Sequence, residues 1–139
     1  MLTLSALGSA LGAGAAAPAA IGAWKKCYAQ NKTAPFMLLA FIGAPLSQTI
    51  YGMIVMNKIM PKALSSPGSW PALLAIGLFG GIAMGASALY QGKAGAAASD
   101  ALGETGKGSE NYLMALGIIE TVAIFVLVFG LVFLGKAIP

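Results

Sequence analysis

Charge is scarce in this sequence, and two kinds of charged side chain are absent. Only 9% of the 139 residues are charged, and all eight basic residues are lysines, with no arginine and no histidine. The single cysteine, Cys27, excludes an internal disulfide. The lysines stand at the ends of apolar segments and form no basic patch, so we predict no nucleic-acid binding. The glycine-rich stretch 103–108 lacks the lysine and hydroxyl pattern of a phosphate-binding loop, and neither a nucleotide nor a haem is expected.

Long hydrophobic runs dominate what is present. The chain is 58% hydrophobic, with a mean hydropathy of +0.84, which is typical of a bundle inside a membrane. The N-terminal run has no preceding basic residue, so we expect it to be a retained helix rather than a cleaved signal. The composition predicts an all-α membrane protein with four transmembrane helices, at about residues 2–24, 35–60, 70–101 and 112–134.

The four segments form an internal repeat. A helix of small residues, a polar loop and a bulkier helix occur twice, which predicts two duplicated antiparallel hairpins. We place the first hairpin at 1–62, a connector at 63–69 and the second hairpin at 70–139. Small residues at four-residue intervals allow close helix packing in lipid, and the packing residues we predict are Gly8, Gly12, Gly77, Gly81 and Gly85.

Lysine placement predicts how the hairpins are oriented. Four spans put both termini on one side of the membrane. The side of the membrane with the hairpin loops, near 25–34 and 102–109, would carry five of the eight lysines, against three on the other side. Because lysine-rich loops favour the cytoplasm, we expect these loops to be cytoplasmic and both termini to lie on the opposite side.

Glu120 is the only charged residue inside the last apolar run, 112–134. A carboxylate near the centre of a bilayer costs about 2.5–3.5 kcal/mol on insertion scales. Such a residue is retained where it has a function, so we take Glu120 as the centre of the candidate site.

Two glutamines should lie at the depth of Glu120. In an antiparallel hairpin, residues equidistant from the turn are level, and Gln91 and Glu120 are equidistant from the turn near residue 105. Each lies about 22 Å from that turn at the rise of an α-helix. Gln48 is about as far along the first hairpin, so the three side chains are expected at one level.

One stripe of the second helix supplies further oxygen atoms at this depth. Ala44, Ser47, Gln48 and Tyr51 follow the spacing of a single helix face. Ser47 and Gln48 carry side-chain oxygens, and the Tyr51 hydroxyl can donate to a carboxylate. Pro45 lacks an N–H group and disturbs the local hydrogen bonds, so a nearby backbone carbonyl can face the site.

If this stripe faces Glu120 and Gln91, the pocket holds one carboxylate and otherwise neutral oxygens. Oxygen ligands suit a hard cation, and one negative charge suits a monovalent cation, so Na⁺ is the predicted guest. The competing interpretation is that the polar residues only hold the helices together.

With these residues in view, the chain resembles the rotor-ring proteolipid of V-type ATPases, the c-type or K subunit. It is most similar to the sodium-translocating bacterial members. The similarity rests on PLSQTIYG in the second helix, on Gln91-Gly92-Lys93 in the third and on Glu120-Thr121 in the fourth.

The resemblance implies a role for each matching position. Glu120 would carry the ion, and Tyr51 would hydrogen-bond Glu120, with Pro45 and Thr121 beside the site. The implied Na⁺ ligands are Glu120, Gln91, Gln48, Ser47 and the backbone carbonyl of Ala44.

The resemblance also implies partners and a location. Copies of the chain would form a homo-oligomeric ring in lipid, next to a stator subunit with an essential arginine. The central stalk of the ATPase would meet the cytoplasmic hairpin loops. Partner subunits would hydrolyse ATP, whereas this chain would have no nucleotide-hydrolysing activity. The membrane would be a bacterial plasma membrane.

Two alternatives stay open from the sequence. A ring of the same fold could carry H⁺, which needs only the carboxyl of Glu120. A small four-helix exporter of cations or drugs could also depend on one membrane glutamate. The sequence assigns no role to Lys93, which follows Gln91 closely.

Overall fold

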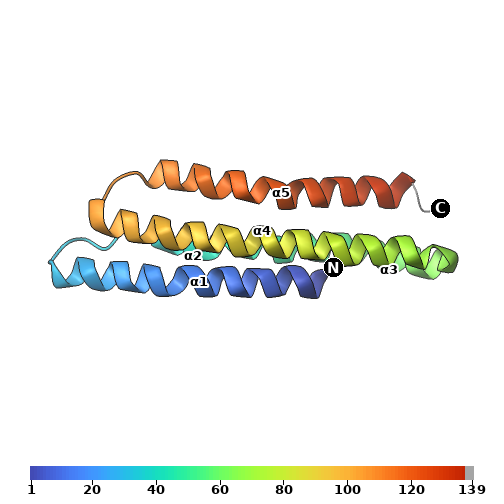
Figure 1. Cartoon of the computed structure of the whole chain (residues 1–139), viewed down its shortest axis with the longest axis horizontal. Helices are drawn as coiled ribbons and strands as arrows, with labels where there is room; N and C mark the ends of the chain where they lie inside the picture. The colour runs from blue at the N-terminus through green and yellow to red at the C-terminus, as the bar shows by residue number, and fades with distance from the viewer. Residues whose placement is uncertain (137–139) are drawn as a thin grey trace.

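The computed structural model describes residues 1–136, and these residues form long helices and short connections (Figure 1). The last three residues of the predicted second hairpin, 137–139, lie outside the described part. The helices are α1 (Leu2–Ala29), α2 (Leu38–Gly43), α3 (Ser47–Ser65), α4 (Trp70–Thr105) and α5 (Ser109–Lys136). Within residues 1–136 there are also two short 3₁₀ helices, η1 (Ala44–Leu46) and η2 (Pro67–Ser69).

Four stretches are long and apolar enough to cross a membrane, which confirms the predicted all-α fold. They are Leu2–Ala29, Leu38–Ser65, Pro67–Thr105 and Ser109–Lys136. α4 continues to Thr105, four residues beyond its expected end, and Gly103 therefore lies inside the helix. α3 continues to Ser65, inside the stretch that we assigned to the connector.

Glycine ends α4 because the chain must turn there. Gly106 has a left-handed backbone (φ 65°), and its N–H group donates to the Leu102 carbonyl at 2.8 Å. A residue without a Cβ adopts this conformation at little cost, so the turn falls where the sequence has Gly106. α5 then begins at Ser109, with Glu110 in its first turn, where the helix dipole favours an acid.

The second span is one helix with a break near its middle. α2, η1 and α3 follow each other without a loop, and Pro45 is the central residue of the 3₁₀ turn. Proline has no N–H group, so the regular hydrogen-bond ladder cannot pass through this point. The break is the local disturbance that the sequence predicts at Pro45.

α1 and α4 run in the same direction and pack more closely than any other pair of helices (Figure 1). Glycines face each other at the points of closest approach, so a Cβ added at Gly8 would collide with Gly85, and one added at Gly92 would collide with Gly12. At Gly77 an added Cβ would make only ordinary contacts. Backbone-to-backbone packing of this kind requires glycine or alanine in a lipid environment.

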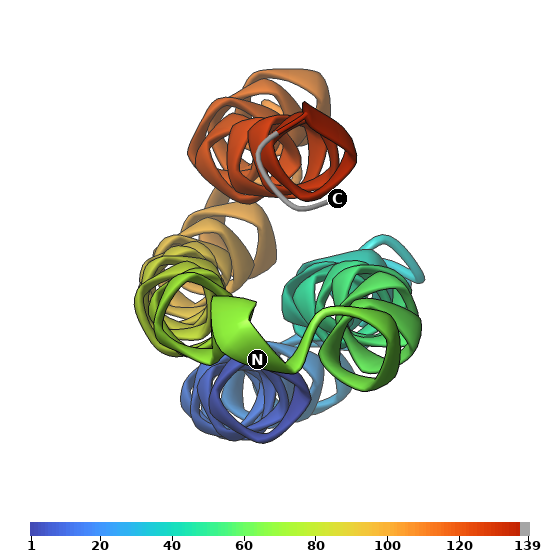
Figure 2. The ribbon, with the colours of Figure 1, turned by 90° about the vertical axis from the view of Figure 1, so that its right-hand side faces the viewer.

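Seen from the end, α1, α3 and α4 form a triangle, and α5 lies against α4 and α3 on the side away from α1 (Figure 2). α3 and α5 run opposite to α1 and α4, so both hairpin turns lie at one end of the bundle (Figure 1). Which side of the membrane this end faces stays a prediction.

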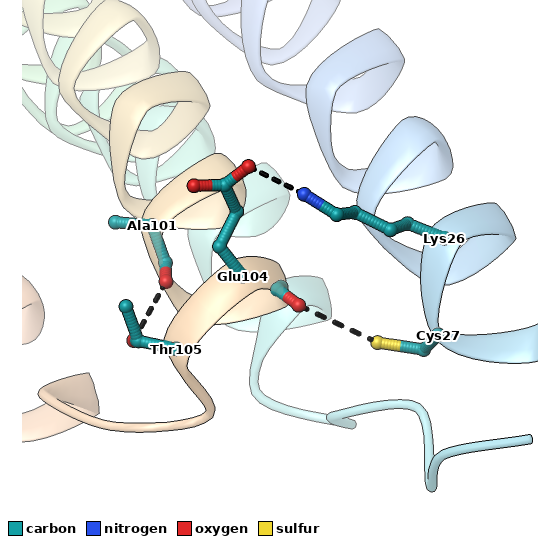
Figure 3. Close-up of polar contacts among 6 residues, drawn as sticks. Lys26, Cys27, Ala101, Glu104 and Thr105 are labelled. Atoms are coloured by element: carbon teal, nitrogen blue, oxygen red, sulfur yellow. Dashed lines mark hydrogen bonds and ion pairs between the residues drawn. The ribbon is translucent and has the colours of Figure 1, made fainter. Parts of the chain in front are cut away.

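An exposed ion pair joins α1 to α4 near the hairpin turns. Lys26 Nζ contacts Glu104 Oε1, and the Cys27 thiol lies 3.9 Å from the Gly103 carbonyl oxygen (Figure 3). The charged side chains are 43% and 56% exposed, so solvent screens their attraction and the pair contributes little to stability. The single cysteine is buried in helix packing.

Replacing Gly92 by alanine should destabilise the bundle, because its Cβ would meet the Gly12 backbone, which cannot move aside as a side chain can. We expect Gly92→Ala to lower the free energy of unfolding by about 1–3 kcal/mol, the usual cost of overpacking. Thermal unfolding of the detergent-purified protein, followed by circular dichroism, measures this. Gly14→Ala is the matched control, since an added Cβ there meets nothing within 4 Å. Equal midpoints for both variants would contradict the close packing of α1 on α4.

Candidate ion site

Glu120 lies half-buried on α5 and receives hydrogen bonds from two other helices. The Tyr51 hydroxyl donates to Glu120 Oε1 at 2.6 Å, and Gln91 Nε2 donates to Glu120 Oε2 at 3.3 Å. Tyr51 is on α3 and Gln91 on α4, so the carboxylate joins three helices. Donors on both oxygens are what a carboxylate needs when little water reaches it.

The two glutamines extend this network away from Glu120. Gln48 Nε2 donates to Gln91 Oε1 at 2.8 Å, and Gln91 Nε2 also reaches the Leu116 carbonyl at 3.1 Å. Both amides are fully buried, at 0% exposure. Their polar atoms are therefore satisfied inside the protein, which is the condition for burying an amide without a large penalty.

Three further oxygens gather where the second span is broken. Ser47 Oγ lies 3.1 Å from the Ala44 carbonyl oxygen and 3.2 Å from Gln48 Oε1. The 3₁₀ turn around Pro45 places the Ala44 carbonyl beside the Ser47 side chain. One backbone carbonyl, one hydroxyl and one amide oxygen thus converge at the start of α3.

Apolar clusters close the polar layer on both sides along the bundle. The cluster toward the hairpin turns includes Phe41, Leu102 and Leu116, and the cluster toward the other end includes Val55, Met84 and Ala123. Glu120, Gln91 and Gln48 lie between them in sequence on their respective helices. Such a layer has a low local dielectric, which strengthens electrostatic interactions inside it.

The structure brings Glu120, Gln91, Gln48, Ser47 and Tyr51 together, at the depth and on the faces expected from the sequence. Whether these residues bind an ion is a separate question, and that role stays a prediction.

Three other residues near the site in sequence lie differently. The Thr121 side chain is exposed and lies outside the site, because neighbouring residues of a helix point to different faces. Its hydroxyl donates to the Ile118 carbonyl of its own helix at 2.6 Å. Lys93 is also exposed and lies over the Tyr90 ring, with 5.3 Å between its ammonium nitrogen and the ring centroid. Pro45 is buried next to Gly12 of α1.

Sequence reasoning missed Ser87. Its hydroxyl lies 3.5 Å from Gln48 Nε2 and donates to the Ile119 carbonyl at 2.9 Å, so it links α4 to α5 beside the site. The available signal was its spacing, since Ser87 is four residues before Gln91 and shares its helix face.

The chemistry of the site is that of oxygen atoms around one carboxylate. No cluster of three or more histidine, cysteine or acidic side chains occurs within residues 1–136. Soft transition metals prefer nitrogen and sulfur ligands, whereas an oxygen set of this charge suits a proton or a monovalent hard cation.

Residues 74–133 match the family model of the ATP synthase C subunit. The matched region contains most of α4 and α5, with Gln91 and Glu120. Neither the curated proteins nor the solved structures include a match.

The family match supports a rotor-ring proteolipid that takes part in ion translocation. Members of that family form rings with copies of themselves, work with the other parts of ATP synthase and are not themselves catalytic. Together with the four apolar spans, the match supports an integral membrane protein.

Gln91 holds the network together, so its loss should destabilise the protein more than the loss of a peripheral hydroxyl. We expect Gln91→Leu to lower the free energy of unfolding by about 1–3 kcal/mol, because Gln48 Nε2 and Glu120 Oε2 both lose a partner. Chemical denaturation in detergent, followed by tryptophan fluorescence, measures the change. The isosteric Thr121→Val should stay within about 0.5 kcal/mol of the original protein, since Thr121 is exposed. A larger loss in Thr121→Val than in Gln91→Leu would be inconsistent with this network.

Proposed function

We propose that the chain is the ring subunit of a V-type rotary ATPase and carries Na⁺ across the membrane on Glu120. Partner subunits would hydrolyse ATP and turn the ring. The observation that carries the proposal is the buried network in which oxygen-bearing side chains from α3 and α4 converge on Glu120. The match of residues 74–133 to the ATP synthase C subunit supports a rotor ring as its setting.

The number of oxygens favours Na⁺ over H⁺. A proton needs only the carboxyl of Glu120, whereas Na⁺ needs several ligands in place of its water shell. Ser47 Oγ, Gln48 Oε1 and the Ala44 carbonyl lie next to one another, and Gln91 Oε1 lies 2.8 Å from Gln48 Nε2. These four, with Glu120, are the ligands that we propose.

The packing of the helices supports a division between inner and outer helices of a ring. α1 and α4 pack through glycines, so the two helices lie close together. This suits the inside of a ring, where space is least. α5 lies on the other side of the bundle and carries exposed side chains such as Phe125 and Phe129, which suit contact with lipid. Glu120 would then be near the outer surface, where a stator arginine can displace the bound ion.

The hairpin end of the bundle is the proposed contact with the central stalk. Both loops lie at this end, and the exposed ion pair between Lys26 of α1 and Glu104 of α4 lies beside them. We propose that this end faces the cytoplasm of a bacterium and that the ring lies in its plasma membrane.

The second candidate is a ring that carries H⁺, and one observation favours it. The Tyr51 hydroxyl lies 2.6 Å from Glu120 Oε1. A hydroxyl can accept as well as donate, so it could accept a hydrogen bond from the protonated carboxyl with no further ligand.

Dicyclohexylcarbodiimide distinguishes the two, because it reacts with a protonated carboxyl. We expect Na⁺ at millimolar concentration to protect Glu120 in purified rings at fixed pH, since bound Na⁺ excludes the proton. K⁺ at the same concentration should give no protection, because it is larger than Na⁺ and needs longer distances to its ligands. Mass spectrometry of the labelled peptide measures the modified fraction. Glu120→Gln is the control for labelling at other residues. A modified fraction that is the same with and without Na⁺ would identify the ring as an H⁺ carrier.

Competition between Na⁺ and the proton should also appear as a pH dependence. Ligands must be deprotonated to bind a metal, so a lower pH weakens Na⁺ binding. Where the proton and Na⁺ exclude each other, each unit of decrease in pH should raise the Na⁺ concentration for half-protection by up to about tenfold. Titrating Na⁺ protection at several pH values measures this. A half-protecting concentration that stays constant even at pH values where Glu120 is mostly protonated would mean that Na⁺ acts away from Glu120.

A further inference from the structure

Ser9 of α1 is buried and has no hydrogen-bond partner within the part of the chain that the structure describes. Its exposure is 1%. A buried hydroxyl without a partner is uncommon and unfavourable, so it calls for an explanation. Ser5, one turn earlier and equally buried, differs, because its hydroxyl donates to the Leu2 carbonyl at 2.8 Å.

Two contacts determine which residue of the second span lies level with Ser9. α1 and α3 are antiparallel, and a Cβ added at Gly52 would collide with Ser5. Toward the hairpin end, a Cβ added at Gly12 would meet Pro45. Ser9 is four residues after Ser5, and the residue four before Gly52 is Gln48. Ser9 also lies on the stripe shared by Ser5 and Gly12, which faces this span.

The contacts of α1 with α4 place Ser9 at the same depth. Gly8 packs on Gly85, and Gly12 packs on the Ala88 carbonyl. Because α1 and α4 are parallel, Ser9 lies between these two contacts, at the level of Ser87. The Ser87 hydroxyl is next to Gln48 Nε2. The unpartnered hydroxyl thus lies behind the polar layer, on the side opposite to Glu120.

Gln48 would need a new acceptor if Na⁺ were bound as proposed. In the structure, Gln48 Nε2 donates to Gln91 Oε1 at 2.8 Å. That oxygen is one of the proposed Na⁺ ligands, and as it turns toward the cation its hydrogen bond to this N–H group would lengthen and weaken. Ser87 Oγ, at 3.5 Å, is a distant substitute.

We propose that Ser9 is a positioning residue, whose hydroxyl accepts a hydrogen bond from Gln48 Nε2 when Gln91 Oε1 turns to Na⁺. This inference rests on the proposed Na⁺ function. Ser9 does not touch the ion. It holds the Gln48 amide in the orientation that directs Oε1 toward Ser47 and the cation.

Removing the hydroxyl should weaken Na⁺ binding and leave the ring intact. For Ser9→Ala we expect about a 3- to 10-fold increase in the Na⁺ concentration that half-protects Glu120 from dicyclohexylcarbodiimide, the effect of one neutral hydrogen bond. Labelling without Na⁺ should keep its original rate and pH profile, because Ser9 does not contact Glu120. Only protein that migrates as a ring is assayed, and Ser9→Cys, which fills the position with a slightly larger group that bonds weakly, should show the same increase.

Ser5→Ala is the matched control, because it removes a hydroxyl from the same buried stripe that bonds only within α1. Its half-protecting concentration should equal that of the original ring. If Ser9→Ala and Ser9→Cys also equal the original, Ser9 does not position Gln48, and the Na⁺ function stands. If Na⁺ protects not even the original ring, the Na⁺ function and the role of Ser9 are both overturned.

Discussion

The structure depends on the hydrogen bonds that one half-buried carboxylate receives in an apolar bundle. Glu120 is tolerable there because Tyr51 and Gln91 donate to its two oxygens, and Gln91 is in turn held by the Leu116 carbonyl and Gln48. Each donor comes from a different helix than the carboxylate. The relative positions of α3, α4 and α5 are therefore constrained by the same hydrogen bonds that satisfy the charge.

Close packing of α1 on α4 is the second constraint, and it acts on the side of the bundle away from α5. Where glycines meet, the two backbones touch, so α1 can approach both α4 and the broken second span. Pro45 fits against Gly12 at the break, and the 3₁₀ turn brings the Ala44 carbonyl to Ser47. A larger residue at Gly12 would push the span away and alter the oxygens that we propose as ligands. Packing and ligand geometry are thus linked through one small residue.

The polar layer is broader than the residues around Glu120. Ser87 connects α4 to α5 beside the glutamines, and Ser9 adds a hydroxyl at the same depth from α1. Every long helix therefore contributes a polar side chain to one level, between two apolar clusters. A layer of this kind can exchange hydrogen-bond partners while its ends stay packed, as the proposed ion carrier would require.

Much of this arrangement follows from the sequence because helix geometry is regular. A constant rise per residue puts Gln48, Gln91 and Glu120 at one depth, and the spacing of Ser47 and Tyr51 puts them on one face. Length and hydropathy determine the four spans. Only the tertiary structure decided how α1 lies against the other helices, because glycine surfaces allow several alignments that a sequence pattern does not separate. The rotation of α4 and α5 left Thr121 outside the group and brought in Ser87, and the alignment of α1 put Ser9 at the level of Gln48. The depth of a residue in the bundle follows from its position along its own helix. Its hydrogen-bond partners depend on how the helices are rotated and offset against one another, which only their packing determines.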